Sequence, residues 1–215
     1  MRHSHILMQY FQAMSQALGA SEWWPAKSSF EVCLGAVLTQ NTSWSNASRA
    51  IEALREQGLL VPDLLEALPE KELSEIIRPA GYYRVKAARI KNLLDFLRQA
   101  ADYDLNRLAR EPVEELRPRL LQVKGIGPET ADSILLYALH LPVFVVDAYT
   151  ARIMHRHAMV PEDVGYAELQ ELFTDNLPQD VALFNEYHAL FVRVGKGWCK
   201  KSEPLCSGCP LQTFK

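Results

Sequence analysis

Apolar residues recur at spacings of three and four along nearly the whole chain, which is the periodicity of amphipathic α-helices. Only residues 143–146, Val-Phe-Val-Val, resemble a strand, and one isolated strand cannot form a sheet. The sequence therefore predicts an all-α fold of about ten short helices joined by short loops. The predicted helices span residues 6–18, 30–38, 45–57, 62–68, 71–77, 85–101, 112–123, 129–139, 148–157, 166–177 and 180–194.

Composition narrows the class of protein. The chain has 215 residues, of which 48% are hydrophobic and 23% charged, as in a globular protein with a sizeable core. No apolar tract reaches the roughly 18 residues of a membrane span, and the N-terminus does not resemble a signal peptide, so we expect a cytoplasmic protein that contacts no membrane. A net charge of −3 does not exclude nucleic-acid binding, because only the local surface meets phosphates.

Two glycines separate two predicted helices in the segment 121–131, Leu-Gln-Val-Lys-Gly-Ile-Gly-Pro-Glu-Thr-Ala. Gly125 and Gly127 favour a tight turn with positive φ, and Pro128 suits the first position of the following helix. Such a turn directs backbone N–H groups outward at a helix N-terminus, where a phosphate can bind. The same pattern also fits a plain connection between two helices.

An aspartate, Asp147, follows the apolar run 143–146 directly and precedes a predicted helix. Aspartate is a preferred N-cap residue, and capping alone would explain it.

Together, these two segments resemble the endonuclease III superfamily of DNA glycosylases in their order and separation. That superfamily combines a helix–hairpin–helix with a catalytic aspartate. Residues 38–42, Leu-Thr-Gln-Asn-Thr, resemble the segment whose glutamine fills the hole left by a flipped base. Residues 80–87, Ala-Gly-Tyr-Tyr-Arg-Val-Lys-Ala, resemble the family's Gly-Tyr-x-x-Lys-Ala turn. The resemblance covers nearly the whole chain.

The resemblance implies two helical domains and a DNA partner. Residues 24–138 would form a six-helix domain that ends in the helix–hairpin–helix. Residues 1–23 and 139–215 would form the second helical domain, which carries a cysteine loop. We expect a monomer that binds damaged double-stranded DNA. The implied DNA-binding residues are Gln40, Val123, Lys124, Gly125, Ile126 and Gly127.

The resemblance also implies the reaction. Breaking an N-glycosidic bond builds positive charge on the sugar, which the Asp147 carboxylate would stabilise while it orients or activates water. If Asp147 also caps its helix, its position is fixed. Bifunctional members carry a lysine two residues after the second glycine, and that position here is Glu129. Without this amine no Schiff base forms by the usual route, so we expect a glycosylase without lyase activity.

Tryptophans indicate the substrate. Core packing is the usual role of tryptophan, but the patterns Trp-Trp-Pro and Thr-Gln-Asn-Thr-x-aromatic resemble the 3-methyladenine DNA glycosylase branch. There, aromatic rings sandwich an alkylated base, and such rings favour a cation on their faces. We therefore expect an alkylated purine such as 3-methyladenine. Glu129 would favour the positive charge of such a base. Alternatively, Glu129 is a solvated helix residue. The expected base pocket consists of Trp23, Trp24, Pro25, Trp44 and Glu129.

Two other functions compete. An endonuclease III-like glycosylase/AP lyase for oxidised pyrimidines is opposed by Glu129. A non-catalytic DNA-binding iron–sulfur module is opposed by Asp147.

Three cysteines crowd near the C-terminus. The spacing Cys199-x6-Cys206-x2-Cys209 matches the first three ligands of the family's four-cysteine [4Fe–4S] loop, but the fourth position holds Lys215. A cluster with another ligand, a labile cluster, a zinc site and a loop that has lost its metal all stay open. Cys33 is expected to be a small buried apolar residue, and the six histidines form no ligand pattern.

Overall fold

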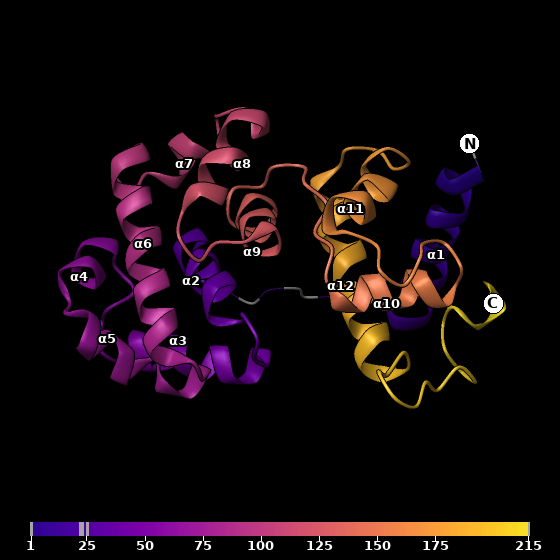
Figure 1. Ribbon diagram of the computed structural model, residues 1–215, viewed down its shortest axis with the longest axis horizontal. Helices are drawn as coiled ribbons and strands as arrows, with labels where there is room; N and C mark the ends of the chain where they lie inside the picture. The colour runs from indigo at the N-terminus through magenta and orange to yellow at the C-terminus, as the bar shows by residue number, and fades with distance from the viewer. Residues whose placement is uncertain (1, 22–23, 25, 215) are drawn as a thin grey trace. The chain divides into compact units, whose positions relative to one another are not determined.

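A computed structural model describes residues 2–21, 24 and 26–214, and within these ranges the chain is helical and contains no β-strand (Figure 1). The predicted all-α fold is confirmed. The side chains of residues 143–146 are buried, but none of the described segments pairs with this run as a strand. The chain divides into two compact units, one of Ala26–Leu141 and one of Met1–Pro25 with Pro142–Lys215. None of the described helices is long and apolar enough to cross a membrane.

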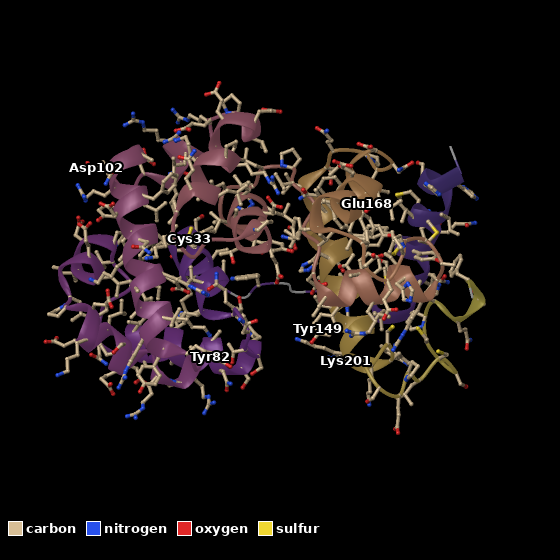
Figure 2. The ribbon with its side chains drawn as sticks, viewed as in Figure 1. Cys33, Tyr82, Asp102, Tyr149, Glu168 and Lys201 are labelled. Carbon is tan, nitrogen blue, oxygen red and sulfur yellow. The ribbon has the colours of Figure 1, made fainter. Side chains whose placement is uncertain are left out.

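The unit Ala26–Leu141 has at its centre a helix that is apolar apart from Ser29 and Glu31. Helix α2 is buried from Phe30 to Leu38, as expected of a helix that is hydrophobic on all sides. Cys33 lies on it, and burial raises the pKa of the Cys33 thiol to about 12, so this cysteine is the buried residue that its sequence context predicts (Figure 2). The elements of this unit are α2 (Ser29–Leu38), α3 (Trp44–Glu56), α4 (Pro62–Ala67), α5 (Glu70–Ile76), η1 (Arg78–Ala80), α6 (Tyr83–Ala101), α7 (Leu105–Leu108), α8 (Val113–Gln122), α9 (Pro128–Ser133) and η2 (Ile134–Ala138).

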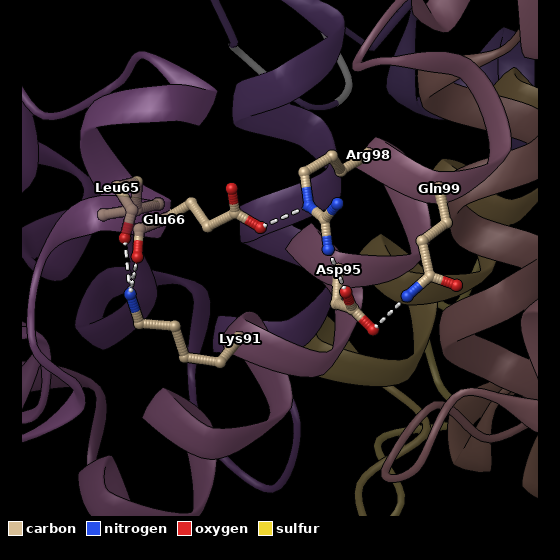
Figure 3. A network of polar contacts seen from close by, with 6 residues as sticks. All are labelled: Leu65, Glu66, Lys91, Asp95, Arg98 and Gln99. Atoms are coloured by element: carbon tan, nitrogen blue, oxygen red, sulfur yellow. Dashed lines mark hydrogen bonds and ion pairs between the residues drawn. The ribbon is translucent and has the colours of Figure 1, made fainter.

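The long helix α6 packs against α2, α4 and α5 and fastens α4 by polar contacts. The last carbonyl groups of a helix have no partner within it. Lys91 of α6 donates to the carbonyl oxygens of Leu65 and Glu66 at 2.7 Å each (Figure 3). It also donates to the carbonyl oxygen of Leu68. Arg98, two turns further on, pairs with the Glu66 carboxylate at 2.9 Å. These contacts fix the short helix α4, whose own length is too small to make it stable.

The second unit is built around α12, which packs against α1 and α10. Its core is aromatic: the Phe144 ring stacks on Phe173 with centroids 4.2 Å apart, and the Tyr187 ring meets both at their edges. The Tyr187 hydroxyl donates to the Leu7 carbonyl oxygen at 2.7 Å, which joins α12 to the N-terminal helix. The elements of this unit are α1 (Arg2–Leu18), α10 (Ala148–Arg156), α11 (Tyr166–Thr174), α12 (Val181–Gly197) and η3 (Gln212–Phe214).

Candidate functional site

Asp147 is the N-cap of α10. One carboxylate oxygen, Oδ1, accepts hydrogen bonds from the backbone N–H of Thr150 at 2.8 Å and from its hydroxyl at 2.9 Å. The capping interpretation is confirmed. Because two donors hold Oδ1, the position of the carboxylate is fixed before any substrate binds.

The other oxygen of Asp147, Oδ2, lies 3.6 Å from Nε2 of His188. Both side chains are almost completely buried, with 11% and 7% of their surface exposed. Burial raises the pKa of Asp147, but the neighbouring His188 and the two hydrogen bonds from Thr150 outweigh burial and hold the pKa below its usual value of 3.8. Asp147 is therefore a fixed, buried carboxylate that stays ionised at neutral pH.

The helix that Asp147 caps, α10, and the helix that carries His188, α12, approach each other closely. Gly195 of α12 packs against Tyr149 of α10, and a Cβ atom added at Gly195 would lie 2.3 Å from the Tyr149 ring. Glycine is the residue that permits such proximity. The approach holds α12, which carries His188, against α10, which Asp147 caps.

Sequence reasoning gave His188 no role. The one available signal is that His188 lies on a helix face whose other members, Phe184, Tyr187 and Phe191, are buried and aromatic. A single histidine on an apolar face is a weak indication, because it has no spacing relation to Asp147. Only the packing of α12 on α10 brings the two side chains together.

The predicted helix–hairpin–helix lies in the other unit, as α8, a turn and α9. The Arg117 guanidinium of α8 makes two hydrogen bonds to the fully buried Asp132 carboxylate of α9, at 2.7 and 3.0 Å. A bidentate pair of this kind fixes the angle between two groups as well as their separation. It therefore clamps the two helices on either side of the turn.

The two glycines of the turn have different conformations. Gly125 has φ +94°, as predicted, but Gly127 has φ −94° and ψ 177°, so the expectation of positive φ at Gly127 is wrong. Gly127 is already extended because it is the N-cap that leads into Pro128. A Cβ at Gly125 would lie 2.4 Å from Cγ of Arg89, whereas one at Gly127 would meet nothing within 4 Å. Of the two glycines in the turn, packing within the protein thus requires glycine at Gly125 and not at Gly127.

The remaining hairpin residues divide into an anchor and an exposed edge. The Ile126 side chain is buried, with 4% of its surface exposed. Val123 is half-buried, while Lys124 and Gly127 are exposed. The turn is thus held by one apolar side chain and offers a cationic side chain and bare backbone to solvent, which suits contact with a phosphate.

Gln40 lies against the hairpin. Its Nε2 donates to the carbonyl oxygen of Gly125 at 3.1 Å and to the hydroxyl of Thr130 at 2.9 Å. Its Oε1 accepts a hydrogen bond from Arg89. The structure therefore brings together two of the sequence segments predicted to bind DNA, residues 38–42 and the hairpin turn.

A buried lysine, Lys86, binds the backbone of the segment that carries Gln40. Lys86 has 1% of its surface exposed, and its ammonium donates to the carbonyl oxygens of Leu38 and Ala80 at 2.8 Å each. Burial and the neighbouring charge of Arg89 lower the pKa of Lys86 to about 8. Lys86 thereby joins the segment that carries Gln40 to the Gly-Tyr-x-x-Lys-Ala turn.

The residues expected to form a base pocket are only partly described. Trp44 is half-buried and begins α3, and Glu129 is exposed in the first turn of α9, both in the unit Ala26–Leu141. Trp24 is half-buried and belongs to the other unit. Trp23 and Pro25 lie outside the described residues.

The three C-terminal cysteines line one hollow. Cys199 is buried just after α12, Cys206 and Cys209 are half-buried, and Arg156 and His157 line the same hollow. Within the described ranges, no three histidine, cysteine, aspartate or glutamate side chains stand close enough together to hold a metal ion. The donors are thus gathered around one space without converging on a point. Lys215, where a fourth cysteine would fall, lies outside the described residues.

Comparison with known proteins decides the family. Residues 34–179 match the family described as HhH-GPD superfamily base excision DNA repair protein. The chain belongs to the HhH-GPD superfamily. A Methanocaldococcus jannaschii protein whose name assigns it to the DNA repair glycosylases is 43% identical to this HhH-GPD protein over 212 residues, 97% of this chain and 92% of the relative. The resemblance to DNA glycosylases of base excision repair is confirmed.

Other proteins similar to this HhH-GPD protein include members of two branches. The endonuclease III of Sulfolobus acidocaldarius is 28% identical over 186 residues, 86% of this chain and 80% of the relative. An H. pylori 3-methyladenine DNA glycosylase bound to 1,N6-ethenoadenine is 27% identical, with a TM-score of 0.77 over 90% of this chain and 97% of that one. An endonuclease III–DNA covalent intermediate shares the fold, at 23% identity and a TM-score of 0.83 over 98% and 94%. The suspected superfamily and branch both have support.

Proposed function

We propose that this HhH-GPD protein hydrolyses the N-glycosidic bond of an alkylated purine such as 3-methyladenine in double-stranded DNA, as a monomer and without lyase activity. One observation carries the proposal: a fixed, ionised carboxylate at Asp147 is combined with a carboxylate, Glu129, at the position where lyases of the superfamily carry an amine. The similarity to a 3-methyladenine DNA glycosylase structure supports the substrate class.

The chemistry that Asp147 supplies follows from its charge. The target nucleotide must leave the base stack, because the bond to be broken is inaccessible within the duplex. As the base departs with the bonding electrons, positive charge develops on the sugar, and the Asp147 carboxylate stabilises it. Water then adds to the anomeric carbon and gives a proton to the carboxylate. An N3-alkylated adenine is already cationic, so its departure needs no strong acid.

The hairpin and Gln40 supply the proposed DNA contacts. Exposed Lys124 and the open backbone at Gly127 would meet the phosphates, and the turn is rigid because Ile126 anchors it. Gln40, which reaches the same turn, would fill the space that the extruded base leaves.

The base pocket is proposed from the resemblance. Trp44 would stack on the flipped base and Glu129 would favour its positive charge. The same resemblance assigns Trp23, Trp24 and Pro25 to binding of the base.

The cysteine loop is proposed to hold a [4Fe–4S] cluster through Cys199, Cys206 and Cys209. Its donor chemistry fits, because thiolates are the preferred ligands of such clusters and the three cysteines line one hollow. The cluster would act structurally, by supporting a loop whose basic residues meet phosphates. Lys200 and Lys201 are exposed there, and Arg156 holds their carbonyl oxygens at 2.7 and 2.9 Å.

Base release tests the proposal. Duplexes that each carry one lesion are incubated with the protein, and the freed base is identified by mass spectrometry. We expect release of 3-methyladenine and no protein–DNA adduct after borohydride reduction, which captures only a Schiff base. The Asp147→Asn protein serves as the control.

An endonuclease III-like glycosylase/lyase is the second candidate. Its support is the identity of 28% with an archaeal endonuclease III over 86% of the chain. Release of an oxidised pyrimidine together with a borohydride-captured adduct would establish this function and refute our proposal.

A further inference from the structure

An arginine of α6, Arg89, lies directly against the hairpin turn. Its half-buried side chain passes Gly125 so closely that a Cβ atom there would lie 2.4 Å from Cγ of Arg89 and 2.9 Å from its Nε. The guanidinium then donates a hydrogen bond to Oε1 of Gln40. The Arg89 side chain thus joins the two segments that are proposed to contact DNA, the hairpin turn and residues 38–42.

The positive charge of Arg89 has no carboxylate beside it. Among the described residues, neither Arg89 nor Lys86, the next cation on α6, forms an ion pair. The two residues are three positions apart, so they lie on the same side of the helix. Burial and the charge of Arg89 lower the pKa of Lys86 to about 8. Like charges disfavour each other, and an anion bound at Arg89 would relieve that repulsion.

We propose that Arg89 binds a phosphate of the DNA backbone beside the hairpin turn and that the same side chain positions Gln40. The inference rests on the DNA contacts proposed above and adds a residue to them. A guanidinium carries five N–H donors in a planar fork that matches phosphate oxygens. Within the described part of the chain, Gln40 is the one hydrogen-bond partner of Arg89, so donors are left for a phosphate.

The link to Gln40 gives this phosphate contact a second effect. The Gln40 amide is held at both ends, since Nε2 donates to the Gly125 carbonyl oxygen at 3.1 Å and to the Thr130 hydroxyl at 2.9 Å, while Oε1 accepts from Arg89. Without Arg89, only the Nε2 end is fixed. The residue that binds the phosphate therefore also sets the position of the residue proposed to fill the space of the extruded base.

The test measures binding of the full chain to a duplex that carries a central abasic analogue, between about 50 and 200 mM salt. Arg89→Met removes the charge but keeps an apolar stem against Gly125, and Arg89→Gln is a second neutral variant that keeps an N–H donor. The matched control is Arg98→Met. It removes the same charge from the same helix, but Arg98 is paired with the carboxylates of Glu66 and Asp95.

We expect both Arg89 variants to lower the slope of log affinity against log salt by about 0.9, the value of one phosphate contact. Their melting temperatures should not fall, because the repulsion with Lys86 is removed. Arg98→Met should keep the wild-type slope. In a series of duplexes with one neutral methylphosphonate each, the linkage that weakens wild-type binding most should have little effect on Arg89→Met. The losses from Arg89→Met and Gln40→Ala should be less than additive, because the two side chains act together.

Three results would overturn the inference. An unchanged slope in both Arg89 variants, with or without a lower melting temperature, would show that Arg89 binds no phosphate. An equal change of slope in Arg98→Met would show an effect of net charge alone. Strict additivity of Arg89→Met and Gln40→Ala would refute the positioning of Gln40. All of these measurements are of binding, so base release from the same preparations judges the glycosylase proposal separately.

Discussion

The exchange of Asp147 for asparagine separates the charge of this side chain from its capping role. Asparagine keeps an oxygen that can accept the Thr150 N–H and hydroxyl bonds, which are 2.8 and 2.9 Å long in the wild type. It also caps helices about as well as aspartate. The fold should therefore survive, and the catalytic loss should come from the missing charge.

The size of that loss follows from the burial of the site. Two unit charges about 4 Å apart interact by roughly 4 kcal/mol at an effective dielectric constant of about 20. The Asp147 side chain is 11% exposed, so bulk water screens it only weakly. Since about 1.4 kcal/mol corresponds to a tenfold change in rate, Asp147→Asn should slow base release by on the order of 10³-fold.

Asp147→Ala provides a comparison that removes the cap as well. It should show a similar catalytic loss and, in addition, lower the free energy of unfolding by about 1 kcal/mol. Single-turnover release of 3-methyladenine measures the rate, and urea unfolding measures the stability. Asp180→Asn is the matched control, because Asp180 caps α12 by accepting the Leu183 N–H at 2.7 Å but is exposed. It should leave both quantities nearly unchanged.

The pH dependence of stability gives a second measure of the same carboxylate. The pKa of Asp147 lies below its usual 3.8 in the folded chain, so the unfolded chain binds more protons in that range. The stabilising contribution is complete above pH 3.8 and is lost as the pH falls through the folded pKa. The stability difference between wild type and Asp147→Asn should therefore shrink on acidification. Near-native turnover of Asp147→Asn, or an equal loss in Asp180→Asn, would refute the reasoning.

Four further substitutions test the unit Ala26–Leu141. Lys86→Met should lower the free energy of unfolding by about 2–4 kcal/mol in urea titrations, because two buried carbonyl groups lose their donor. The folded pKa of Lys86 is about 8 against the usual 10.5, so the unfolded chain binds more protons between these values and the wild-type advantage should grow with pH across that window. Gly125→Ala should lower the melting temperature, since φ at Gly125 is +94° and Arg89 occupies the space that a Cβ atom would need. Gly127→Val should keep the melting temperature and weaken salt-dependent DNA binding. The reverse pattern would contradict the geometry of the turn. Trp44→Ala should slow 3-methyladenine release by roughly 10- to 100-fold, from about 1–3 kcal/mol of stacking, and spare the affinity for an abasic duplex, whereas an equal loss of both would indicate a core role.

Much of the fold was predictable because it depends on local chemistry. Helix positions followed from apolar spacing, and the cap at Asp147 followed from an aspartate placed just before such a spacing. The φ angle of Gly127 was predicted wrongly, because Pro128 sets the start of α9 and leaves Gly127 extended. Two glycines in a turn do not reveal which of them takes the strained conformation.

The sequence by itself determined which segments are helical, where the turn between α8 and α9 lies, and which side chains are chemically able to act, since each depends on a few neighbouring residues. Only the tertiary structure decided what those side chains contact. His188 lies beside Asp147, Gln40 reaches Gly125 across 85 positions, and His157 shares a hollow with cysteines of the C-terminal segment. Such contacts arise when separate helices bury their apolar faces against one another, and no spacing along the chain encodes them.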